Sequence, residues 1–478
     1  MLFNSISYAI FLPLVFTIYW AIGGKRLRLQ NIFLLTVSYY FYSCWDWRFL
    51  FLLVFSTFLD YFCGIKIENA VRESSRKFWL WLSIIVSLGF LGIFKYYNFF
   101  AVSFAEFVNK LGFEIHPTIL KIVLPVGISF YTFHGLSYVI DIYKRKISAE
   151  KNFVNYALFV SFFALLVAGP IERATHLLPQ IKKFRVFDYS QAIDGLRQIL
   201  WGLFKKIVIA DNCAQFANQI FNDYQHYSGS DLLIGAFFFT VQIYGDFSGY
   251  SDIALGSARL LGFNLLKNFS YPYFSRDIAE FWRRWHISLS TWFRDYLYIP
   301  LGGSRGGIWS KIRNTFIIFL VSGFWHGANW TFIAWGALNA FYFLPLLLSK
   351  SNRANLDIVA KGRTFPSFRE FTGIVLTFIL TLFAWVFFRS PTIVDAFHYI
   401  TNIFTTSILN VPSVLPKGIL LLVAFFFAIE WKGREGNFAL HYFGLQWNRY
   451  IRLSFYSLLV FLIFWFGGSQ QQFIYFQF

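Results

Sequence analysis

Long apolar runs alternate with short polar segments over most of the chain. Several of the runs approach, alone or with their flanks, the roughly 20 helical residues that cross a bilayer. The long runs cover residues 5–22, 79–94, 119–140, 153–168, 372–388, 418–430 and 451–466. Shorter or interrupted runs cover residues 31–44, 49–63 and 232–245. The pattern predicts an all-α polytopic membrane protein with about eleven membrane segments.

Composition agrees with this pattern. The 478 residues are 57% hydrophobic and only 14% charged, whereas a soluble domain has roughly 25% charged residues. Secretion as a soluble protein is therefore excluded. The run 5–22 lacks a basic leading segment and a small-residue cleavage site, so we interpret it as a first membrane helix rather than a signal peptide.

The net charge of +18 is spread over short basic clusters beside the apolar runs, which argues against a nucleic-acid partner. The cluster at 25–28 follows the first run, the cluster at 66–77 follows the third, and the cluster at 144–146 follows the run that ends near Tyr143. The positive-inside rule predicts that all three are cytoplasmic and that the N-terminus lies outside. The topology of 171–314 is not readable from this pattern.

We find no internal repeat, linker or appended soluble domain, and we predict one integral membrane domain over residues 1–478. Cys44, Cys63 and Cys213 are isolated, so neither a disulfide framework nor a zinc site is expected. The chain also lacks a GxGxxG motif and a P-loop, so we expect no tightly bound nucleotide cofactor.

Polar segments interrupt the apolar pattern at two places before residue 260. Residues 191–212 have helical periodicity with basic side chains on other faces, which fits an interfacial helix or a membrane helix with a basic end equally well. Asp246 and Asp252 directly follow an apolar run. Acids at membrane depth face protein or water, and pairing with a nearby Arg is favoured over a functional role.

Two histidines occupy unusual surroundings. His286 lies in the polar stretch RWHISLSTWFRDYLYIPLGG (284–303), and His326 lies between Gly323 and Gly327 in an apolar region. Each is either a functional group or a histidine satisfied within a helix bundle. A buried imidazole stays neutral and can act as general base on an alcohol that attacks a thioester or ester. We find no GxSxG motif of a serine hydrolase.

The stretches EFWRRWHISLSTWFRDYLYIPLGG (280–303) and SGFWHGANWTFIAWGALNA (322–340) resemble the signature of the membrane-bound O-acyltransferase family, in its bacterial branch of alginate O-acetyltransferases. Segments within 124–143, 166–180, 202–212 and 242–263 are also similar to it. The resemblance covers about residues 5–390 and is weaker over 391–478. It implies a ring of tilted helices around a central funnel, with 272–310 as a re-entrant segment covered by protein.

By this resemblance the catalytic histidine falls on His326 and the second polar position on His286. The residues predicted to bind substrate are Arg283, Arg284, Trp285, Ser290, Arg294, Trp325 and Asn329. The arginines would meet an anionic donor or an acidic partner, and phospholipid head groups are an equally simple alternative.

The sequence thus predicts an enzyme of the bacterial inner membrane that moves acetyl groups from a cytoplasmic donor, acetyl-CoA or another acyl thioester, towards an extracytoplasmic polysaccharide such as alginate. Peptidoglycan or another envelope glycan is an alternative acceptor. Expected partners are the lipid bilayer, a periplasmic SGNH-type acetyltransferase, a polysaccharide biosynthesis complex and an acyl-carrier protein. A non-catalytic transporter or scaffold in polysaccharide export is the alternative from another class.

Overall fold

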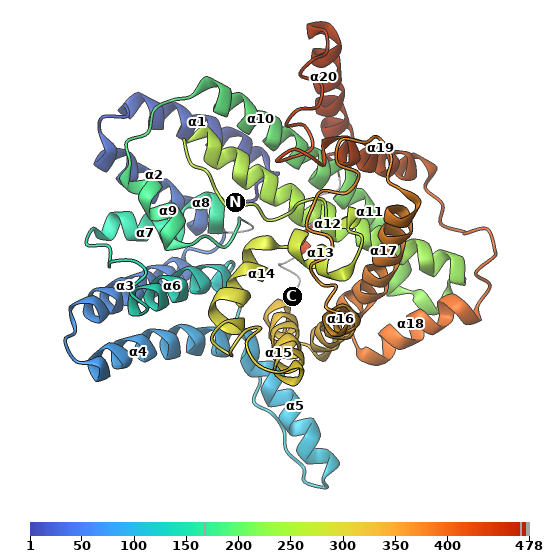
Figure 1. Ribbon diagram of the computed structural model, residues 1–478, viewed down its shortest axis with the longest axis horizontal. Helices are drawn as coiled ribbons and strands as arrows, with labels where there is room; N and C mark the ends of the chain where they lie inside the picture. Colours follow the sequence, from blue (N-terminus) through green and yellow to red (C-terminus); the bar gives the residue numbers. More distant parts are fainter. Residues whose placement is uncertain (167–168, 469–470, 475–478) are drawn as a thin grey trace. The chain divides into compact units, whose positions relative to one another are not determined.

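The computed structural model describes residues 1–166, 169–468 and 471–474, and every regular element among them is a helix. Figure 1 shows these helices with their labels. Contacts divide the chain into two compact units. The first comprises Met1–Ala192 and Ser257–Leu266, and the second comprises Ile193–Gly256 and Lys267–Phe478.

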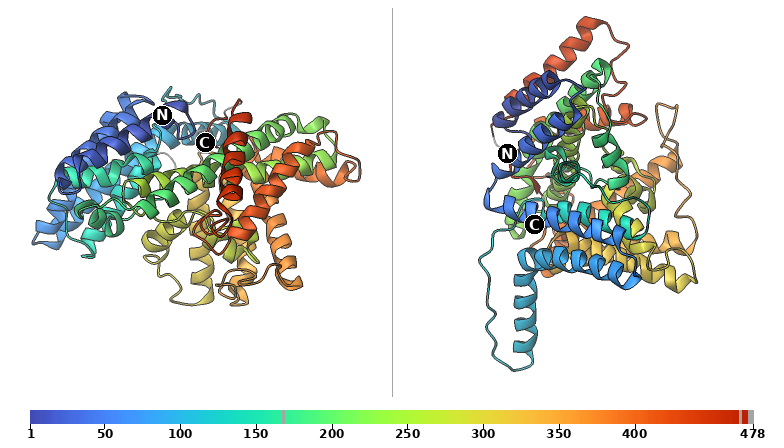
Figure 2. Two further views of the ribbon diagram at one scale, coloured as in Figure 1. Left: turned by 90° about the horizontal axis from the view of Figure 1, so that it is seen from above. Right: turned by 90° about the vertical axis from the view of Figure 1, so that its left-hand side faces the viewer.

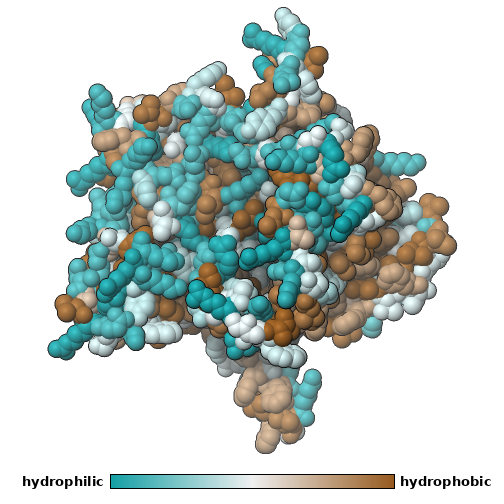
Figure 3. All heavy atoms as spheres, viewed as in Figure 1, coloured by the Kyte–Doolittle hydropathy of each residue, from teal (hydrophilic) through white to brown (hydrophobic). Residues whose placement is uncertain are grey.

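The first unit is built from helices that reproduce most of the predicted apolar runs. Its helices are α1 (Ile6–Ile22), α2 (Leu27–Ser43), α3 (Arg48–Asn69), α4 (Glu73–Leu91), α5 (Tyr97–Lys110), α6 (Ile128–Tyr143), α7 (Phe153–Ser161), α8 (Phe163–Leu166) and α9 (Ala174–Lys182). The last two residues of the predicted run 153–168 lie outside the described residues. Helix α5 projects from this unit (Figure 2), and its surface carries apolar side chains (Figure 3), among them Phe100, Phe104 and Phe107.

One predicted run is wrong in its first half. The run 119–140 was expected to be helical throughout, but α6 begins only at Ile128 and residues 113–125 have no regular structure. Gly127 adopts a left-handed conformation with φ 74° at the N-cap, which side chains other than glycine rarely tolerate. Pro125 precedes it and disfavours helical geometry in the residue before it. Hydrophobicity alone does not report these two backbone constraints.

The second unit holds the remaining helices and most of α10 and α12. Its helices are α10 (Tyr189–Leu203), the π-helix η2 (Phe204–Ala210), α11 (Asp211–Asn222), α12 (Gly229–Leu260), α13 (Ile278–Arg284), α14 (Ile287–Phe293), the π-helix η5 (Arg294–Tyr298), α15 (Ile308–His326), α16 (Trp330–Leu348), α17 (Phe368–Arg389), α18 (Ile393–Thr405), α19 (Lys417–Gly433) and α20 (Arg449–Trp465). The predicted helical segment 191–212 is thus part of a continuous helical stretch.

Five helical segments in the part of the chain that the structure describes are long and apolar enough to cross a membrane. They are Arg48–Asn69, Glu73–Lys110, Gly229–Leu260, Trp330–Leu348 and Phe368–Arg389. In α12 the most apolar window is 83% buried within the protein, whereas in the segment that contains α4 and α5 it is only 22% buried. Large apolar surfaces left exposed in this way require lipid. The chain is therefore a multi-pass membrane protein.

Helices α15 and α16 form a closely packed antiparallel hairpin joined by residues 327–329. A Cβ atom on Gly323 would clash with the Phe332 carbonyl oxygen, and one on Gly336 would clash with the Phe319 carbonyl oxygen. Small residues allow such close approach between membrane helices. The glycines near His326 therefore serve helix packing, and they hold the end of α15 against the start of α16.

Candidate active site

His286 lies at a sharp turn between the short helices α13 and α14. Its backbone adopts a left-handed conformation with φ 43° and ψ 53°, which costs about 1–3 kcal/mol for a residue other than glycine. The flanking chain holds this turn, because the Ile287 amide donates to the Asn268 carbonyl (2.9 Å) and the Ser270 amide donates to the Arg284 carbonyl (3.0 Å). The position of the imidazole is therefore determined by a strained turn and a backbone clamp.

Aromatic rings enclose the His286 side chain, which is only 1% exposed. Its ring centroid lies 4.7 Å from that of Phe247, 6.5 Å from that of Phe269 and 5.9 Å from that of Trp325. His286 lies outside the membrane-spanning helices, and burial lowers its pKa to about 3, because a charged imidazolium is poorly solvated among these rings. The ring is therefore neutral at physiological pH.

His326 is the last residue of α15 and is 4% exposed. Its ring centroid lies 5.2 Å from that of Trp335 on α16 and 5.4 Å from that of Phe388 on α17. The centroids of the His286 and His326 rings are 6.4 Å apart, although η5 and most of α15 separate the two residues in the chain. The fold thus brings the two predicted catalytic histidines together inside one enclosure of aromatic rings, the histidine pocket.

This arrangement suits proton transfer in a water-poor environment. A hydroxyl within about 3 Å of a ring nitrogen can donate a hydrogen bond to it. A neutral imidazole accepts a proton from a hydroxyl at such a distance, and aromatic walls exclude competing water. Trp325 forms one wall of the pocket, and Trp285 packs 6.2 Å from Tyr244 and 5.0 Å from Trp385.

Asn329, also predicted to bind substrate, is the N-cap of α16. Its side-chain oxygen accepts a hydrogen bond from the Thr331 amide (3.0 Å), and its side-chain amide donates to the Pro391 carbonyl (3.0 Å). It therefore anchors the helix that packs beside His326. Ser290 and Arg294 lie elsewhere, on the wall of a basic cleft described below.

The two neighbouring arginines, Arg283 and Arg284, contact protein groups. Arg283 donates to the carbonyls of Asn352 (2.8 Å) and Asn355 (2.7 Å). Arg284 donates from two nitrogens to the Glu280 carboxylate (2.7 and 3.0 Å) and also to the Ser270 carbonyl (3.2 Å). These contacts hold the segment around His286, and the predicted role of both arginines in substrate binding stays a prediction.

Substituting Arg284 with lysine tests that role. A single ammonium cannot reproduce the planar fork on the buried Glu280, so we expect Arg284→Lys to reduce the free energy of unfolding by about 1–3 kcal/mol. The dependence of acyl transfer on donor concentration in this variant and in Arg283→Lys separates a structural role from donor binding, because an unchanged dependence indicates a structural role alone. Thermal unfolding in detergent and donor titrations measure the two effects, and a raised donor KM in either variant would instead show donor binding.

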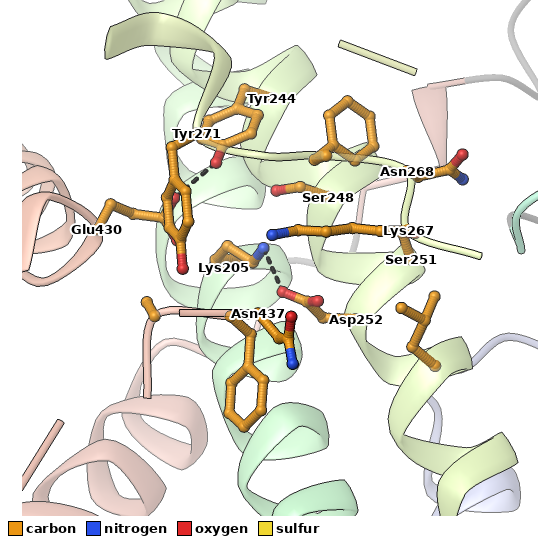
Figure 4. A pocket seen from close by; sticks show the side chains of 14 residues that line it. Lys205, Tyr244, Ser248, Ser251, Asp252, Lys267, Asn268, Tyr271, Glu430 and Asn437 are labelled. Carbon is orange, nitrogen blue, oxygen red and sulfur yellow. Dashed lines mark hydrogen bonds and ion pairs between the residues drawn. The ribbon is translucent and has the colours of Figure 1, made fainter. Parts of the chain in front are cut away.

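A polar chamber beside the histidine pocket was missed at the sequence level (Figure 4). It has a volume of about 20 Å³, which is room for a water molecule, and Asn268 and Phe269 contribute to its wall. Within it Lys205 donates to Asp252 (2.6 Å) and Tyr244 donates to the Glu430 carboxylate (2.6 Å). The Asn268 side chain links the chamber to α14, because its oxygen accepts a hydrogen bond from the Ser288 hydroxyl (2.6 Å).

The expected pairing of the α12 acids is confirmed, with lysine rather than arginine as the partner. Lys205 pairs with Asp252, and Lys206 lies 2.8 Å from Asp246 and 2.7 Å from Asp211. A further lysine, Lys267, also borders the chamber, and burial lowers its pKa to about 8. The basic end noted in 191–212 thus neutralises acids on the neighbouring helix, a role that only the contacts between helices reveal.

Comparison with known proteins decides the family. The model of the membrane-bound O-acyltransferase family matches residues 143–389, which include both pocket histidines. The chain belongs to the membrane-bound O-acyltransferase family. It is therefore an O-acyltransferase, an enzyme that transfers acyl groups to hydroxyls.

The names of relatives of this O-acyltransferase refer to alginate, peptidoglycan and teichoic acid. The chain is 40% identical to a probable alginate O-acetylase of Pseudomonas aeruginosa over 85% of its length and 75% of the relative. It is 35% identical to a peptidoglycan O-acetyltransferase of Helicobacter pylori over 83% of its length and 78% of the relative. A teichoic acid D-alanyltransferase of Bacillus subtilis is 26% identical over 55% of the chain and 68% of the relative.

Proposed function

We propose that this O-acyltransferase takes acetyl groups from a cytoplasmic thioester donor and moves them across the membrane for O-acetylation of an extracytoplasmic polysaccharide. The observation that carries the proposal is the pair of buried histidines, whose ring centroids are 6.4 Å apart in one aromatic pocket. A pocket that keeps imidazole neutral provides the base that an attacking hydroxyl requires.

In the proposed reaction His326 is the general base. One of its ring nitrogens accepts the proton of the acceptor hydroxyl as the hydroxyl oxygen bonds to the acyl carbon. The carbon–sulfur bond of the thioester then breaks, and the departing sulfur takes the proton from the His326 imidazolium. His286 orients the donor or stabilises the negative charge on the acyl oxygen, and the dry pocket strengthens that interaction.

Alginate is the acceptor polymer that the resemblance favours, and peptidoglycan is the alternative. Support for a glycan acceptor comes from the relatives named as alginate O-acetylases and from the peptidoglycan O-acetyltransferase. Acetyl-CoA or an acyl-carrier protein is the proposed donor. Arg294, Ser290 and Trp325 are proposed to contact substrate, as are Arg283, Arg284, Trp285 and Asn329.

We place the enzyme in the bacterial inner membrane, with about eleven tilted helices around a central funnel. A periplasmic SGNH-type acetyltransferase is the proposed partner that attaches the acetyl group to the glycan, within a polysaccharide biosynthesis complex. The exposed apolar helices support the bilayer environment, and the family resemblance supports the partner.

Deleting the gene in its native host tests this function. Envelope and exported glycans from the deletion strain should lack O-acetyl groups, and re-expression of the chain should restore them, as measured by the acetate that mild base releases from purified glycans. The amount of exported glycan should not change. A deletion strain with little exported glycan whose remaining polymer is fully acetylated would contradict acyl transfer and indicate an export scaffold.

A further inference from the structure

A cleft in the second unit takes no part in the proton transfer derived above. It has a volume of about 470 Å³ and lies along α14, η5 and the α15–α16 hairpin. Among the described residues, no Asp or Glu lines this cleft.

Four cations border this cleft: Arg294, Lys311, Lys350 and Arg353. Of these four cations, only Arg294 is in an ion pair with another described residue, Asp295, at 2.8 Å. Lys311 is in the first turn of α15, and Lys350 and Arg353 directly follow α16, so the antiparallel hairpin gathers them at one end. Cations concentrated without acidic partners favour an anionic ligand.

The rest of the wall is apolar. Ile318 and Phe319 on α15 face the cleft together with Phe343 and Leu347 on α16, and the Phe319 and Phe343 rings are 5.9 Å apart. At 1.5 Å per helical residue, Phe319 lies about 12 Å along α15 from Lys311. The cleft therefore offers a cationic end and an apolar wall of a length that suits an anionic head group with an extended chain.

The cleft also begins close to the histidine pocket. Ser290 contributes to its wall, and the Ser290 amide donates to the His286 carbonyl (3.0 Å) one turn earlier on α14. Phe319 packs against Trp282 at 5.3 Å, and Trp282 packs against Trp335 of the histidine pocket at 5.6 Å. A ligand in the cleft would thus lie against the elements that position both histidines.

We propose that this cleft binds a phosphate-bearing amphiphile, with the phosphate on Lys311, Lys350 and Arg353 and the chain along Phe319 and Phe343. Phosphate fits because it carries up to two charges and several acceptor oxygens, which match converging Lys and Arg donors. The same chemistry is present in a phosphorylated thioester donor and in a membrane phospholipid. The experiment measures ligand binding and not acyl transfer, so its outcome does not depend on whether the proposed function is correct.

The test compares two double variants of the purified protein in a neutral detergent. Lys350→Glu/Arg353→Glu reverses two cleft cations, and Lys361→Glu/Lys432→Glu makes the same change of charge at two exposed lysines outside the cleft. Calorimetric titration with coenzyme A, and with pantetheine as the phosphate-free control, measures affinity. Native mass spectrometry measures retained phosphatidylglycerol.

The cleft variant should bind coenzyme A or phosphatidylglycerol about tenfold or more weakly than the unmodified protein, and the surface variant should stay within about twofold. Pantetheine should bind more weakly than coenzyme A, and its affinity should be the same in both variants.

Binding of coenzyme A alone assigns the cleft to the donor. Preferential binding of phosphatidylglycerol, or displacement of coenzyme A by it, assigns the cleft to lipid. Equal binding of both probes by the cleft variant and the unmodified protein would overturn the proposal. Lys350→Gln/Arg353→Gln replaces the cleft variant if the reversed charges prevent folding.

Discussion

Replacing His326 with glutamine is expected to reduce acyl transfer by about 10²–10⁴-fold. Glutamine keeps most of the side-chain volume and can hydrogen-bond, so the packing against Trp335 and Phe388 is largely preserved. Its amide cannot accept the proton of an attacking hydroxyl at neutral pH. The measurement is transfer of labelled acetyl groups by the purified enzyme, together with glycan acetylation in cells that carry only the variant.

His398→Gln is the matched control for this variant. His398 is exposed on α18 and does not contact the pocket, so the same substitution there should leave transfer unchanged. Equal expression and an unchanged melting temperature in detergent would show that His326→Gln folds. Acetylation at the unmodified level in a folded His326→Gln enzyme would contradict a general-base role and favour a non-catalytic scaffold.

His286 and His326 are expected to act as a unit, so their defects should not multiply. Each single variant should reduce transfer strongly, and the double variant should be little worse than the worse single variant. The expectation rests on the shared pocket, in which the two ring centroids are 6.4 Å apart. Rates from His286→Asn, His326→Gln and the double variant give the coupling directly.

Asparagine is the appropriate replacement at His286 because of the backbone. The residue has φ 43°, and asparagine tolerates left-handed geometry better than most residues. His286→Ala would add backbone strain to the lost imidazole and mix a folding defect with a catalytic one. A double variant whose defect equals the product of the two single defects would show that the histidines act independently.

Helix positions that depend on local hydrophobicity were readable from the sequence. The runs 372–388, 418–430 and 451–466 correspond to α17, α19 and α20 with small shifts at their ends. The prediction of a helix over 119–140 was wrong in its first half, because the backbone preferences of Pro125 and Gly127 outweighed the apolar composition of this run. Hydropathy reports where a side chain prefers to be, and it does not report which φ and ψ angles the chain adopts.

The sequence predicted the ion-pair and hydrogen-bond partners of these side chains only in part. The cost of leaving Asp246 and Asp252 unpaired predicted that each would pair with a nearby Arg, and the structure supplies Lys206 and Lys205 from a neighbouring helical segment instead. Arg283 and Arg284 were predicted to bind substrate, which stays a prediction, and the sequence did not show that carbonyls and Glu280 accept hydrogen bonds from them. Local sequence does not show whether an arginine side chain is already hydrogen-bonded within the protein, because its acceptors come from residues that the fold brings near.

The sequence by itself determined the membrane character of the chain, the identity of the two candidate histidines and the family motifs around them, since these depend on residue type and local spacing. Only the tertiary structure decided that His286 and His326 share one pocket, that Asn268 clamps the turn before α14, and that the cations of the α15–α16 hairpin gather at one cleft. These features depend on how segments that are separate in the sequence pack together, and within the α15–α16 hairpin the close approach of backbones at Gly323 and Gly336 sets that packing.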